Sequence, residues 1–386
     1  MKFLKDIDLK GARVLYRVDI NSNIKDGKLL DDDRIRAIIP TVREMQKMGA
    51  RQIIIMAHQG RDNKRGPDTV LDLHANRLSE LLGQKVLKFD QCRGVEIPKD
   101  AELVMLENVR LDDEASEDAA KRQACAVDLS KYGDVYVNDA FAACHREHST
   151  ICELPKLMKV KAAGLLLQKE KEALKPLLKG EIEQPFTLIV GGAKIDTKIA
   201  LINNFAKKAG AFLLGGGIAN TFLAAEGFDI GMSLQEKDKY ETAREIALSL
   251  DKRLFLPKDV ICADKCSASA STVDVPVEDV IGDMMILDIG KKTAQNYAEI
   301  IKQSKTIIWN GPMGYAEYPQ FRKGSEAIAR AMAEADATTI IGGGESVGVI
   351  NMLGIPHDKY THVSTGGGAM LEYLSGVKLP GIEALK

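Results

Sequence analysis

"TTIIGGGESVGVI" runs from Thr338 to Ile350 and carries the pattern that decides the fold. A short β-branched run leads into three glycines, and an apolar stretch follows at once. This order of strand, tight turn and helix is typical of turns whose backbone N–H groups approach a phosphate closely. Glu345 stands in the same turn, so the stretch also predicts a cation between carboxylate and phosphate.

The same order repeats along the chain. In the first half we expect strands over 13–20, 51–58, 102–108 and 134–139, and helices over 34–49 and within 117–133. In the second half we expect strands over 185–192, 210–217, 254–264, 284–290, 305–311 and 338–344, and helices over 198–210, 241–250 and 292–304. Strands that alternate with helices of this length predict parallel sheets covered on both faces.

One expected helix carries an interruption. Its apolar face is formed by Ile35, Ile38, Ile39, Val42 and Met45. Pro40 lies among them and predicts a kink or a late helix start.

The 386 residues suffice for two domains, and the charged, helical stretch 165–185 separates the two series of strands. The fold class is therefore α/β, with two doubly wound parallel-sheet (Rossmann-like) domains. We expect the boundary at 1–168 and 169–369.

Bulk properties exclude several function classes. The 53 Lys and Arg nearly balance the 55 Asp and Glu, so no nucleic acid is expected as a partner. The sequence contains no apolar run long enough to span a bilayer and no secretory signal at its start. Six cysteines without repeated spacing favour a reducing, cytoplasmic location.

Polar side chains follow the first-half strands, where ligands bind in open α/β sheets. They include Asp19, Asn21, His58, Arg61, Arg110 and Arg146, with Arg34 at a helix start. Arginine and histidine suit small, highly anionic ligands. Glycines follow the second-half strands instead and suit a nucleotide. Together the two sets predict phosphoryl transfer between a small acid and a nucleotide.

Each feature has a simpler interpretation. Glycine turns also serve close packing, and single arginines are often solvated. The sequence contains no Walker A motif, and "GGGIAN" and "GGGAML" carry Asn220 and Leu371 where the dinucleotide pattern has its third glycine. "CHREHSTIC" (Cys144–Cys152) could instead hold zinc, although its spacing is irregular and Arg146 would repel a cation.

Ten motifs, in order, resemble the phosphoglycerate kinase family along nearly the whole chain. They are "RVDIN" (17–21), "DDDRIRA" (31–37), "HQGR" (58–61), "LENVR" (106–110), "VNDAFAACHREH" (137–148), "GGAKIDTKI" (191–199), "GGGIANTFL" (215–223), "WNGPMGYAE" (309–317), "IIGGGES" (340–346) and "VSTGGGAMLEYL" (363–374). "HQGR" and "LENVR" look more like archaeal members.

The resemblance implies two lobes joined by a hinge, a phosphoglycerate-binding N-terminal domain, a nucleotide-binding C-terminal domain, and a tail of about 370–386 that returns to the first. The reaction would move the 1-phosphoryl of 1,3-bisphosphoglycerate to Mg-ADP, giving 3-phosphoglycerate and ATP. The substrate-binding positions would be Asp19, Asn21, Arg34, His58, Gln59, Gly60, Arg61, Arg110 and Arg146. The catalytic positions would be Arg34, Lys194, Gly366 and Gly367.

The same resemblance, with the glycine turns, implies the nucleotide positions Gly192, Lys198, Gly215, Gly216, Gly217, Asn310, Pro312, Glu317, Gly342, Gly343, Gly344 and Glu345. Mg²⁺ would be the cofactor, with Glu345 as its ligand where the family commonly has Asp. No membrane and no obligate protein partner are implied. Two alternatives stay open: a non-catalytic nucleotide-binding protein on this fold, and a kinase for a related phospho-acid.

Overall fold

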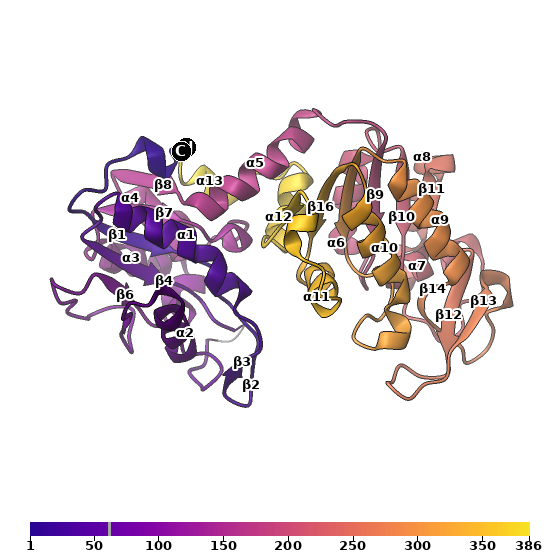
Figure 1. The fold of residues 1–386 in the computed structure, drawn as a ribbon, viewed down its shortest axis with the longest axis horizontal. Coiled ribbons are helices and arrows are strands. Elements are labelled where there is room, and N and C mark those ends of the chain that lie inside the picture. The colour runs from indigo at the N-terminus through magenta and orange to yellow at the C-terminus, as the bar shows by residue number, and fades with distance from the viewer. Residues whose placement is uncertain (61–62) are drawn as a thin grey trace. The chain divides into compact units, whose positions relative to one another are not determined.

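The computed structural model describes residues 1–60 and 63–386. The chain divides into two compact units (Figure 1), which are Met1–Ala173 with Lys378–Lys386 (unit 1) and Leu174–Val377 (unit 2). The division falls within helix α5 (Leu165–Lys179). Each unit has its own six-stranded parallel sheet, so the α/β fold class is confirmed.

The sheet of unit 1 has the strand order β5-β6-β4-β1-β7-β8, and all neighbours are parallel. Its strands are β1 (Arg13–Arg17), β4 (Gln52–Met56), β5 (Leu87–Lys88), β6 (Leu103–Met105), β7 (Val135–Asn138) and β8 (Val160–Ala163). The other elements are the hairpin β2 (Ile24–Lys25) and β3 (Lys28–Leu29), and helices α1 (Asp33–Lys47), α2 (Asp72–Leu82), α3 (Ala119–Ser130), α4 (Leu154–Leu157) and α13 (Pro380–Glu383).

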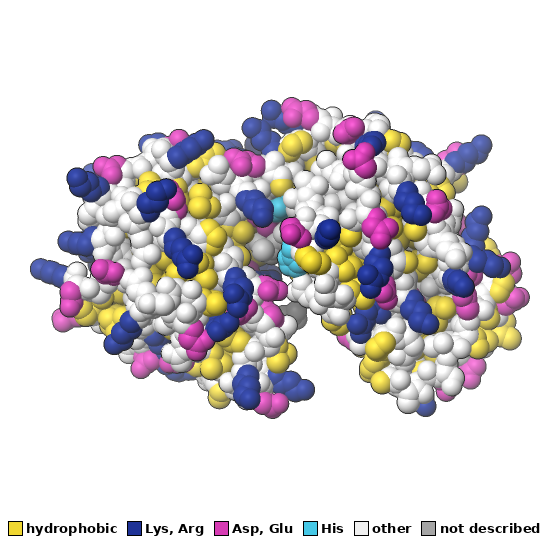
Figure 2. All heavy atoms as spheres, in the orientation of Figure 1, with side chains coloured by type: hydrophobic (Ala, Val, Ile, Leu, Met, Phe, Trp, Pro, Cys, Tyr) yellow, Lys and Arg dark blue, Asp and Glu magenta, His cyan; other side chains and the backbone are white. Residues whose placement is uncertain are grey.

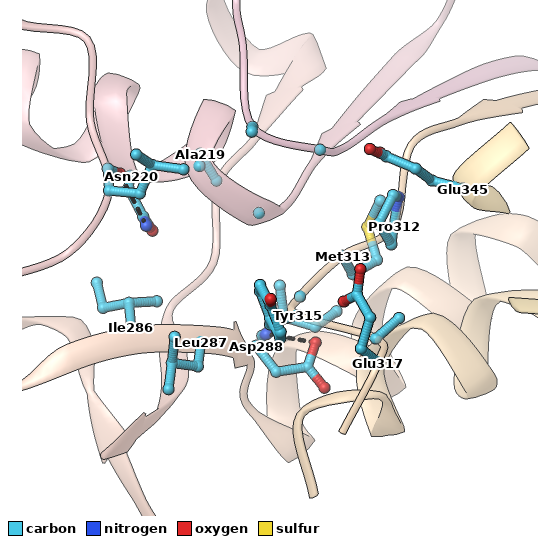
Figure 3. A pocket seen from close by; sticks show the side chains of 18 of the residues that line it. Ala219, Asn220, Ile286, Leu287, Asp288, Pro312, Met313, Tyr315, Glu317 and Glu345 are labelled. Atoms are coloured by element: carbon cyan, nitrogen blue, oxygen red, sulfur yellow. Dashed lines mark hydrogen bonds between the residues drawn. The ribbon is translucent and has the colours of Figure 1, made fainter. Parts of the chain in front are cut away.

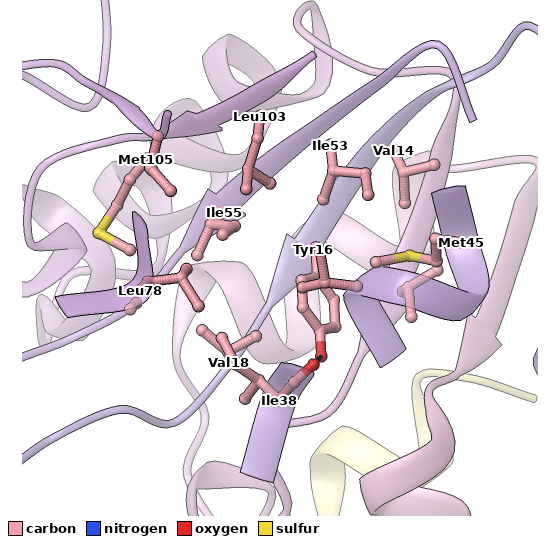
Figure 4. Packing of buried hydrophobic residues seen from close by; sticks show 14 of the residues in the cluster. Val14, Tyr16, Val18, Ile38, Met45, Ile53, Ile55, Leu78, Leu103 and Met105 are labelled. Carbon is pink, nitrogen blue, oxygen red and sulfur yellow. Dashed lines mark hydrogen bonds between the residues drawn. The ribbon is translucent and has the colours of Figure 1, made fainter. Parts of the chain in front are cut away.

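The core of unit 1 lies between the sheet and its helices (Figure 4). Val14 and Tyr16 of β1 and Ile53 and Ile55 of β4 are at most 1% exposed, and they meet Met45 of α1. Every residue of β4 is buried, as expected for a strand of a parallel sheet covered on both faces.

Unit 2 has the strand order β11-β10-β9-β15-β16-β17. Counted along the chain this is 3-2-1-4-5-6, the Rossmann order, with the reversal beside β9. The strands are β9 (Phe186–Val190), β10 (Ala211–Leu214), β11 (Leu254–Phe255), β15 (Thr306–Asn310), β16 (Thr338–Gly342) and β17 (His362–Val363). The helices are α6 (Asp196–Phe205), α7 (Gly216–Glu226), α8 (Tyr240–Leu250), α9 (Lys291–Lys302), α10 (Lys323–Glu334), α11 (Gly344–Met352) and α12 (Gly368–Leu374).

The prediction of two parallel strands, over 254–264 and 284–290, is wrong. Both stretches contribute to a separate three-stranded antiparallel sheet. The stretch 254–264 splits into β11, in the parallel sheet, and β12 (Asp259–Ala263), which pairs antiparallel with β13 (Val273–Pro276) and β14 (Met285–Ile289). Pro257 lies between β11 and β12 and has no N–H to donate to a ladder. The apolar residues on both sides of Pro257 nevertheless give the sequence the pattern of one continuous buried strand.

Helix α1 also differs from expectation. It begins at Asp33 and continues through Pro40, so the late start is wrong. Four of the five expected apolar residues are buried, and Ile39 packs partly buried against the same core. Pro40 is exposed, so its ring lies on the solvent side of the helix.

Charges of both signs are interspersed over the face seen in Figure 2, in keeping with their near balance in the sequence. Among the described residues, no helix combines the length and apolarity that crossing a membrane requires.

Candidate functional site

In unit 1 the loops that follow β1 and β4 are joined by hydrogen bonds. The two strands are parallel neighbours, so their carboxyl ends lie side by side. Gly60 N–H donates to Asn21 Oδ1 at 2.8 Å, and the Gln59 amide bonds both the N–H (3.0 Å) and the carbonyl (2.8 Å) of Ser22. Three predicted substrate residues are thereby brought together.

Asp19 and Arg34 form the central ion pair of this cluster. Arg34 Nη1 donates to Asp19 Oδ2 at 2.5 Å, and the Arg34 side chain is 33% exposed. Burial is the largest single influence and acts to raise the pKa of Asp19, but Arg34 together with His58, the Asn21 N–H and Arg17 outweighs it, and the net shift is downward. Arg34 is therefore held in place while part of its side chain remains accessible.

Two further predicted arginines lie at this edge. Arg110 donates to the carbonyl of Gly60 and is half-buried. Burial lowers its pKa, and the charge of the exposed Arg146 acts in the same direction. Both can therefore contribute positive potential to one site. Arg61 lies outside the described residues.

Sequence reasoning missed a buried cluster beneath these residues. Arg17 is fully buried, and its guanidinium contacts Glu114 Oε1 at 2.9 Å, Thr150 Oγ1 at 2.8 Å and His58 Nδ1 at 3.3 Å. The Thr150 hydroxyl also donates to Glu114. A charged residue inside the apolar strand "RVLYRV" was the available signal for Arg17.

His58 differs from its expected role as a cation. Burial lowers its pKa to about 4, so the ring is neutral near pH 7. The pKa of His148 falls to about 4 for the same reason. At neutral pH the positive charge of this site therefore comes from its arginines.

The zinc alternative is not supported by the geometry. Cys144 Sγ donates to the carbonyl of Ala140 at 3.4 Å, and Cys152 Sγ donates to the carbonyl of Arg146 at 3.5 Å. Within 1–60 and 63–386, no three His, Cys, Asp or Glu side chains form a group that could hold a metal.

In unit 2 the glycine loops after β9, β10 and β15 interlock. Gly192 N–H donates to the carbonyl of Pro312 at 2.8 Å, and Gly216 N–H donates to that of Met313 at 2.8 Å. A Cβ on Gly191 would lie 2.1 Å from the carbonyl oxygen of Pro312, and one on Gly311, at φ +91°, would lie 2.2 Å from that of Gly191. Close packing therefore explains these glycines without a ligand.

The loops border a cavity of about 360 Å³ (Figure 3). Six predicted nucleotide residues line it: Gly192, Gly216, Gly217, Pro312, Glu317 and Glu345. Gly215, Lys198, Asn310 and Gly342 to Gly344 do not line it. The remaining walls are largely apolar, with Leu234, Val260, Ile286, Leu287 and Met313.

Several predicted nucleotide residues that do not line the cavity are hydrogen-bonded to one another beside it. Asn310 Nδ2 donates to the carbonyl of Gly342 at 2.8 Å, and Lys198 donates to Asn310 Oδ1. Burial lowers the pKa of Lys198 to about 8, and the charge of Glu345 opposes that shift. A cation behind the lining thus interacts electrostatically with a carboxylate of the lining.

The remaining predicted catalytic residues are Lys194 and the two glycines before helix α12, Gly366 and Gly367. Lys194 is exposed on the loop after β9, where the next residue's N–H donates to Glu236 Oε2 at 2.5 Å. Helix α12 begins at Gly368, with Gly367 as its N-cap at φ +50°. The Gly366 N–H is already donated to Ser364 Oγ at 3.0 Å.

The donor set fits a nucleotide-bound magnesium ion. Glu345 is exposed in the first turn of α11, and its Oε2 is 3.5 Å from the place that a Cβ on Gly192 would occupy. Mg²⁺ typically takes one or two carboxylates and completes its shell with phosphate oxygens and water. A single carboxylate beside a glycine turn suits that mode of binding.

Comparison with known proteins identifies the family. The phosphoglycerate kinase family model matches residues 4–377. Relatives named phosphoglycerate kinase include those of Clostridium botulinum (strain Hall), 41% identical and covering 100% of this chain and 98% of the relative, and of Dictyoglomus turgidum, 42% identical and covering 99% and 98%. Whether "HQGR" and "LENVR" mark an archaeal member stays a prediction.

Solved structures agree with the sequence relatives. Phosphoglycerate kinase from Coxiella burnetii has a TM-score of 0.85 at 35% identity and covers 99% of this chain and 98% of its own. Phosphoglycerate kinase from Pyrococcus horikoshii OT3 has a TM-score of 0.87 at 31% identity and covers 100% and 98%. The family model, the relatives and the structures all agree along nearly the full length, and the chain belongs to the phosphoglycerate kinase family.

Proposed function

We propose that the chain catalyses the reversible transfer of the 1-phosphoryl group of 1,3-bisphosphoglycerate to Mg-ADP, giving 3-phosphoglycerate and ATP. The transfer is direct and in line. The observation that carries this proposal is the presence of an arginine cluster around Asp19 and Arg34 in one unit and a glycine-lined cavity in the other. Family membership supports the same reaction.

The phosphoglycerate side belongs to residues 1–168, with the tail of about 370–386, and the nucleotide side belongs to 169–369. The phosphoglycerate ligands are Asp19, Asn21, Arg34, His58, Gln59, Gly60, Arg61, Arg110 and Arg146. The nucleotide ligands are Gly192, Lys198, Gly215 to Gly217, Asn310, Pro312, Glu317 and Gly342 to Glu345. A hinge between the two sides allows them to close and exclude water, which would otherwise hydrolyse the acyl phosphate.

Catalysis rests on positioning and electrostatics. The attacking oxygen is already anionic, so no general base is needed. The loose phosphoryl transition state spreads charge over its equatorial oxygens, and Arg34, Lys194 and the helix start at Gly366 and Gly367 supply positive potential there. The Gly366 N–H itself is already donated to Ser364 Oγ.

Glu345 is the proposed ligand of Mg²⁺, directly or through water. When bound, the metal neutralises phosphate charge. We expect Glu345→Gln to raise the Mg²⁺ concentration needed for half-maximal activity several-fold, since one ligand charge is removed. An unchanged Mg²⁺ dependence would count against this role, and Glu326→Gln on α10 is the matched control.

The partners are small molecules, with no nucleic acid, membrane or obligate protein partner, and the location is the cytoplasm. The test is a coupled assay of purified protein with 3-phosphoglycerate, ATP and Mg²⁺. We expect Mg²⁺-dependent turnover. A folded sample without turnover overturns the proposal, and calorimetry with 3-phosphoglycerate then separates a nucleotide-binding protein from a kinase for another phospho-acid.

A further inference from the structure

Asn108 is a buried polar side chain of unit 1 that the proposed function does not use. It follows β6 at the carboxyl edge of the sheet and is 0% exposed. A buried amide costs free energy unless it is hydrogen-bonded. The partners of this side chain therefore show what it does.

The amide of Asn108 bonds backbone groups of three segments. Nδ2 donates to the carbonyls of Gln59 and Thr69, each at 2.8 Å, and Oδ1 accepts the N–H of Arg110 at 3.0 Å. A carbonyl only accepts and a backbone N–H only donates, so the orientation of the amide is unambiguous. One side chain thereby joins the loop after β4, the segment before α2 and the loop after β6.

The bond to Gln59 also acts on the residue that follows it. The carbonyl of Gln59 and the N–H of Gly60 belong to one planar trans peptide group, in which they point in opposite directions. Asn108 bonds the carbonyl, and Asn21 Oδ1 accepts the N–H at 2.8 Å. Two side-chain amides therefore hold this peptide group from opposite sides.

Gly60 needs such support because its conformation is not fixed by a side chain. Its φ is +76°, and glycine has more backbone freedom than any other residue. The Gly60 carbonyl accepts a hydrogen bond from the guanidinium of Arg110, whose backbone N–H is bonded to Asn108. The orientations of Gly60 and Arg110 thus depend on the same amide.

The backbone that carries the amide is itself fixed by Glu107, which is 1% exposed. Glu107 Oε1 accepts the N–H groups of Asn108 at 2.8 Å and Leu71 at 3.0 Å. Its Oε2 pairs with Lys88 at 2.9 Å and Arg65 at 3.1 Å. Asn108 therefore extends from a firmly held point of the chain.

We propose that Asn108 is a positioning residue for phosphoglycerate, which holds Asn21, Gly60 and Arg110 in the arrangement that binds the substrate. The inference rests on the proposed function, in which these three residues are substrate ligands. Asn108 is fully buried, so it acts through them. Small displacements of binding groups are costly, because affinity and rate depend on their exact placement.

A capping role alone makes different predictions. Asn108 is also the N-cap of the short turn Val109–Leu111, through the same bond to the Arg110 N–H. If it is only a cap, its removal lowers stability and leaves the KM values for both substrates alike. If it orients the site, the KM for 3-phosphoglycerate rises, while the KM for ATP, whose proposed site is in unit 2, stays unchanged.

The first test is Asn108→Ala, studied by steady-state kinetics at a temperature where the variant is folded. We expect the KM for 3-phosphoglycerate to rise about 10-fold or more and the KM for ATP to stay within about twofold. Asp118→Ala removes the side-chain N-cap of α3 in the same unit and is the matched control, which should change neither KM. An unchanged KM for 3-phosphoglycerate, or an equal rise in both KM values, overturns the inference.

Failure of the proposed function gives a separate result. A folded wild type without turnover overturns the proposed function, and calorimetric affinities of wild type and Asn108→Ala for 3-phosphoglycerate then decide the inference by the same ratio. A wild type that neither turns over nor binds 3-phosphoglycerate overturns both.

The second test separates the cap from the other two bonds. Asn108→Ser keeps an oxygen that can cap the Arg110 N–H, but its single hydroxyl proton cannot bond both carbonyls. We expect the same selective rise in the KM for 3-phosphoglycerate, and wild-type KM values would overturn the inference. If neither variant folds, Asn108→Asp decides by the same criterion, since it has the size of asparagine and at most one proton for the two carbonyls.

Discussion

Glu114 in unit 1 and Asp288 in unit 2 are both buried carboxylates, at 0% and 1% exposure, yet their pKa values move in opposite directions. Burial acts most strongly and would raise the pKa of Glu114, but the charge of Arg17, together with His148, His58 and the Thr150 hydroxyl, outweighs it and the pKa falls to about 2. Burial raises the pKa of Asp288 to about 8, and the N–H groups of Gly324 and Ile289 and the charge of Lys323 oppose it only in part. The main difference is the set of side chains around Glu114, of which the buried guanidinium of Arg17 lowers its pKa most.

This contrast extends to the two sites. The unit 1 site is built from side-chain charges paired with buried carboxylates, as in Arg17–Glu114, where both partners are buried, and Arg34–Asp19, where Arg34 stays partly exposed. The unit 2 cavity is built from backbone turns that approach too closely for a Cβ at several positions. Unit 1 should therefore be sensitive to deletion of charge, and unit 2 to addition of atoms.

The largest expected effects come from deleting one cation on each side. We expect Arg34→Ala and Lys194→Ala each to lower kcat by roughly 10³-fold or more, the scale of a lost cation that stabilises a transferring phosphoryl group. Steady-state kinetics with 3-phosphoglycerate and ATP measure this loss. Arg36→Ala, which removes a neighbouring exposed arginine paired with Asp32, is the control and should leave kcat nearly unchanged. Near-normal kcat in either active-site variant would contradict its catalytic role.

The buried ion pair is expected to dominate stability in unit 1. Glu114→Gln leaves the guanidinium of Arg17 buried without a charged partner, which typically costs about 3–5 kcal/mol. Urea unfolding at pH 7 measures the change. Glu117→Gln, on an exposed residue nearby, should stay within about 0.5 kcal/mol of the wild type. If the two variants unfold alike, the pair does not carry the difference between the two carboxylates.

Substitutions that add a Cβ to a glycine test the close packing of the loops in unit 2. We expect Gly311→Ala to lower the free energy of unfolding by about 3 kcal/mol, because φ is +91° and the new Cβ would lie 2.2 Å from the Gly191 carbonyl oxygen. Gly348→Ala is the matched change, since this helical glycine has nothing within 4 Å of its Cβ position. That variant should gain about 0.5–1 kcal/mol from better helix propensity. Equal losses in both would show that close approach is not what requires glycine here.

The sequence predicts the features of the fold that depend on local residue patterns. Strand, turn and helix alternate in the order that the parallel sheets of both units require, and the family motifs are contiguous stretches. The antiparallel strands β12 and β14 could not be separated from the parallel ones, because apolar content does not report strand direction. Pro257 was a local signal of the break.

The buried residues of the unit 1 site are held by contacts between residues that lie far apart in the sequence. Glu114 lies in the polar stretch "LDDEASEDAA", which resembles a solvated segment, and its burial follows from contact with Arg17, 97 residues earlier in the chain. His58 likewise loses its expected charge through burial that no local pattern reveals. The roles of the substrate, nucleotide and metal residues themselves stay predictions.

The smallest expected effect is a pH dependence that isolates Asp288. Its folded pKa of about 8 lies above the ordinary value of 3.8, so the stability it contributes is complete below pH 3.8 and is lost as the pH rises through 8. Asp288→Asn removes this titration, and the stability of the variant relative to the wild type should rise by up to about 1.4 kcal/mol per pH unit. Urea unfolding of both proteins at pH 5.5, 6.5 and 7.5 measures the slope. Glu114, His58 and His148 titrate in both proteins, so their contributions cancel in the difference. Parallel profiles would mean that the N–H groups of Gly324 and Ile289 suffice to keep the buried carboxylate ionised, and that a guanidinium is not what separates the two units.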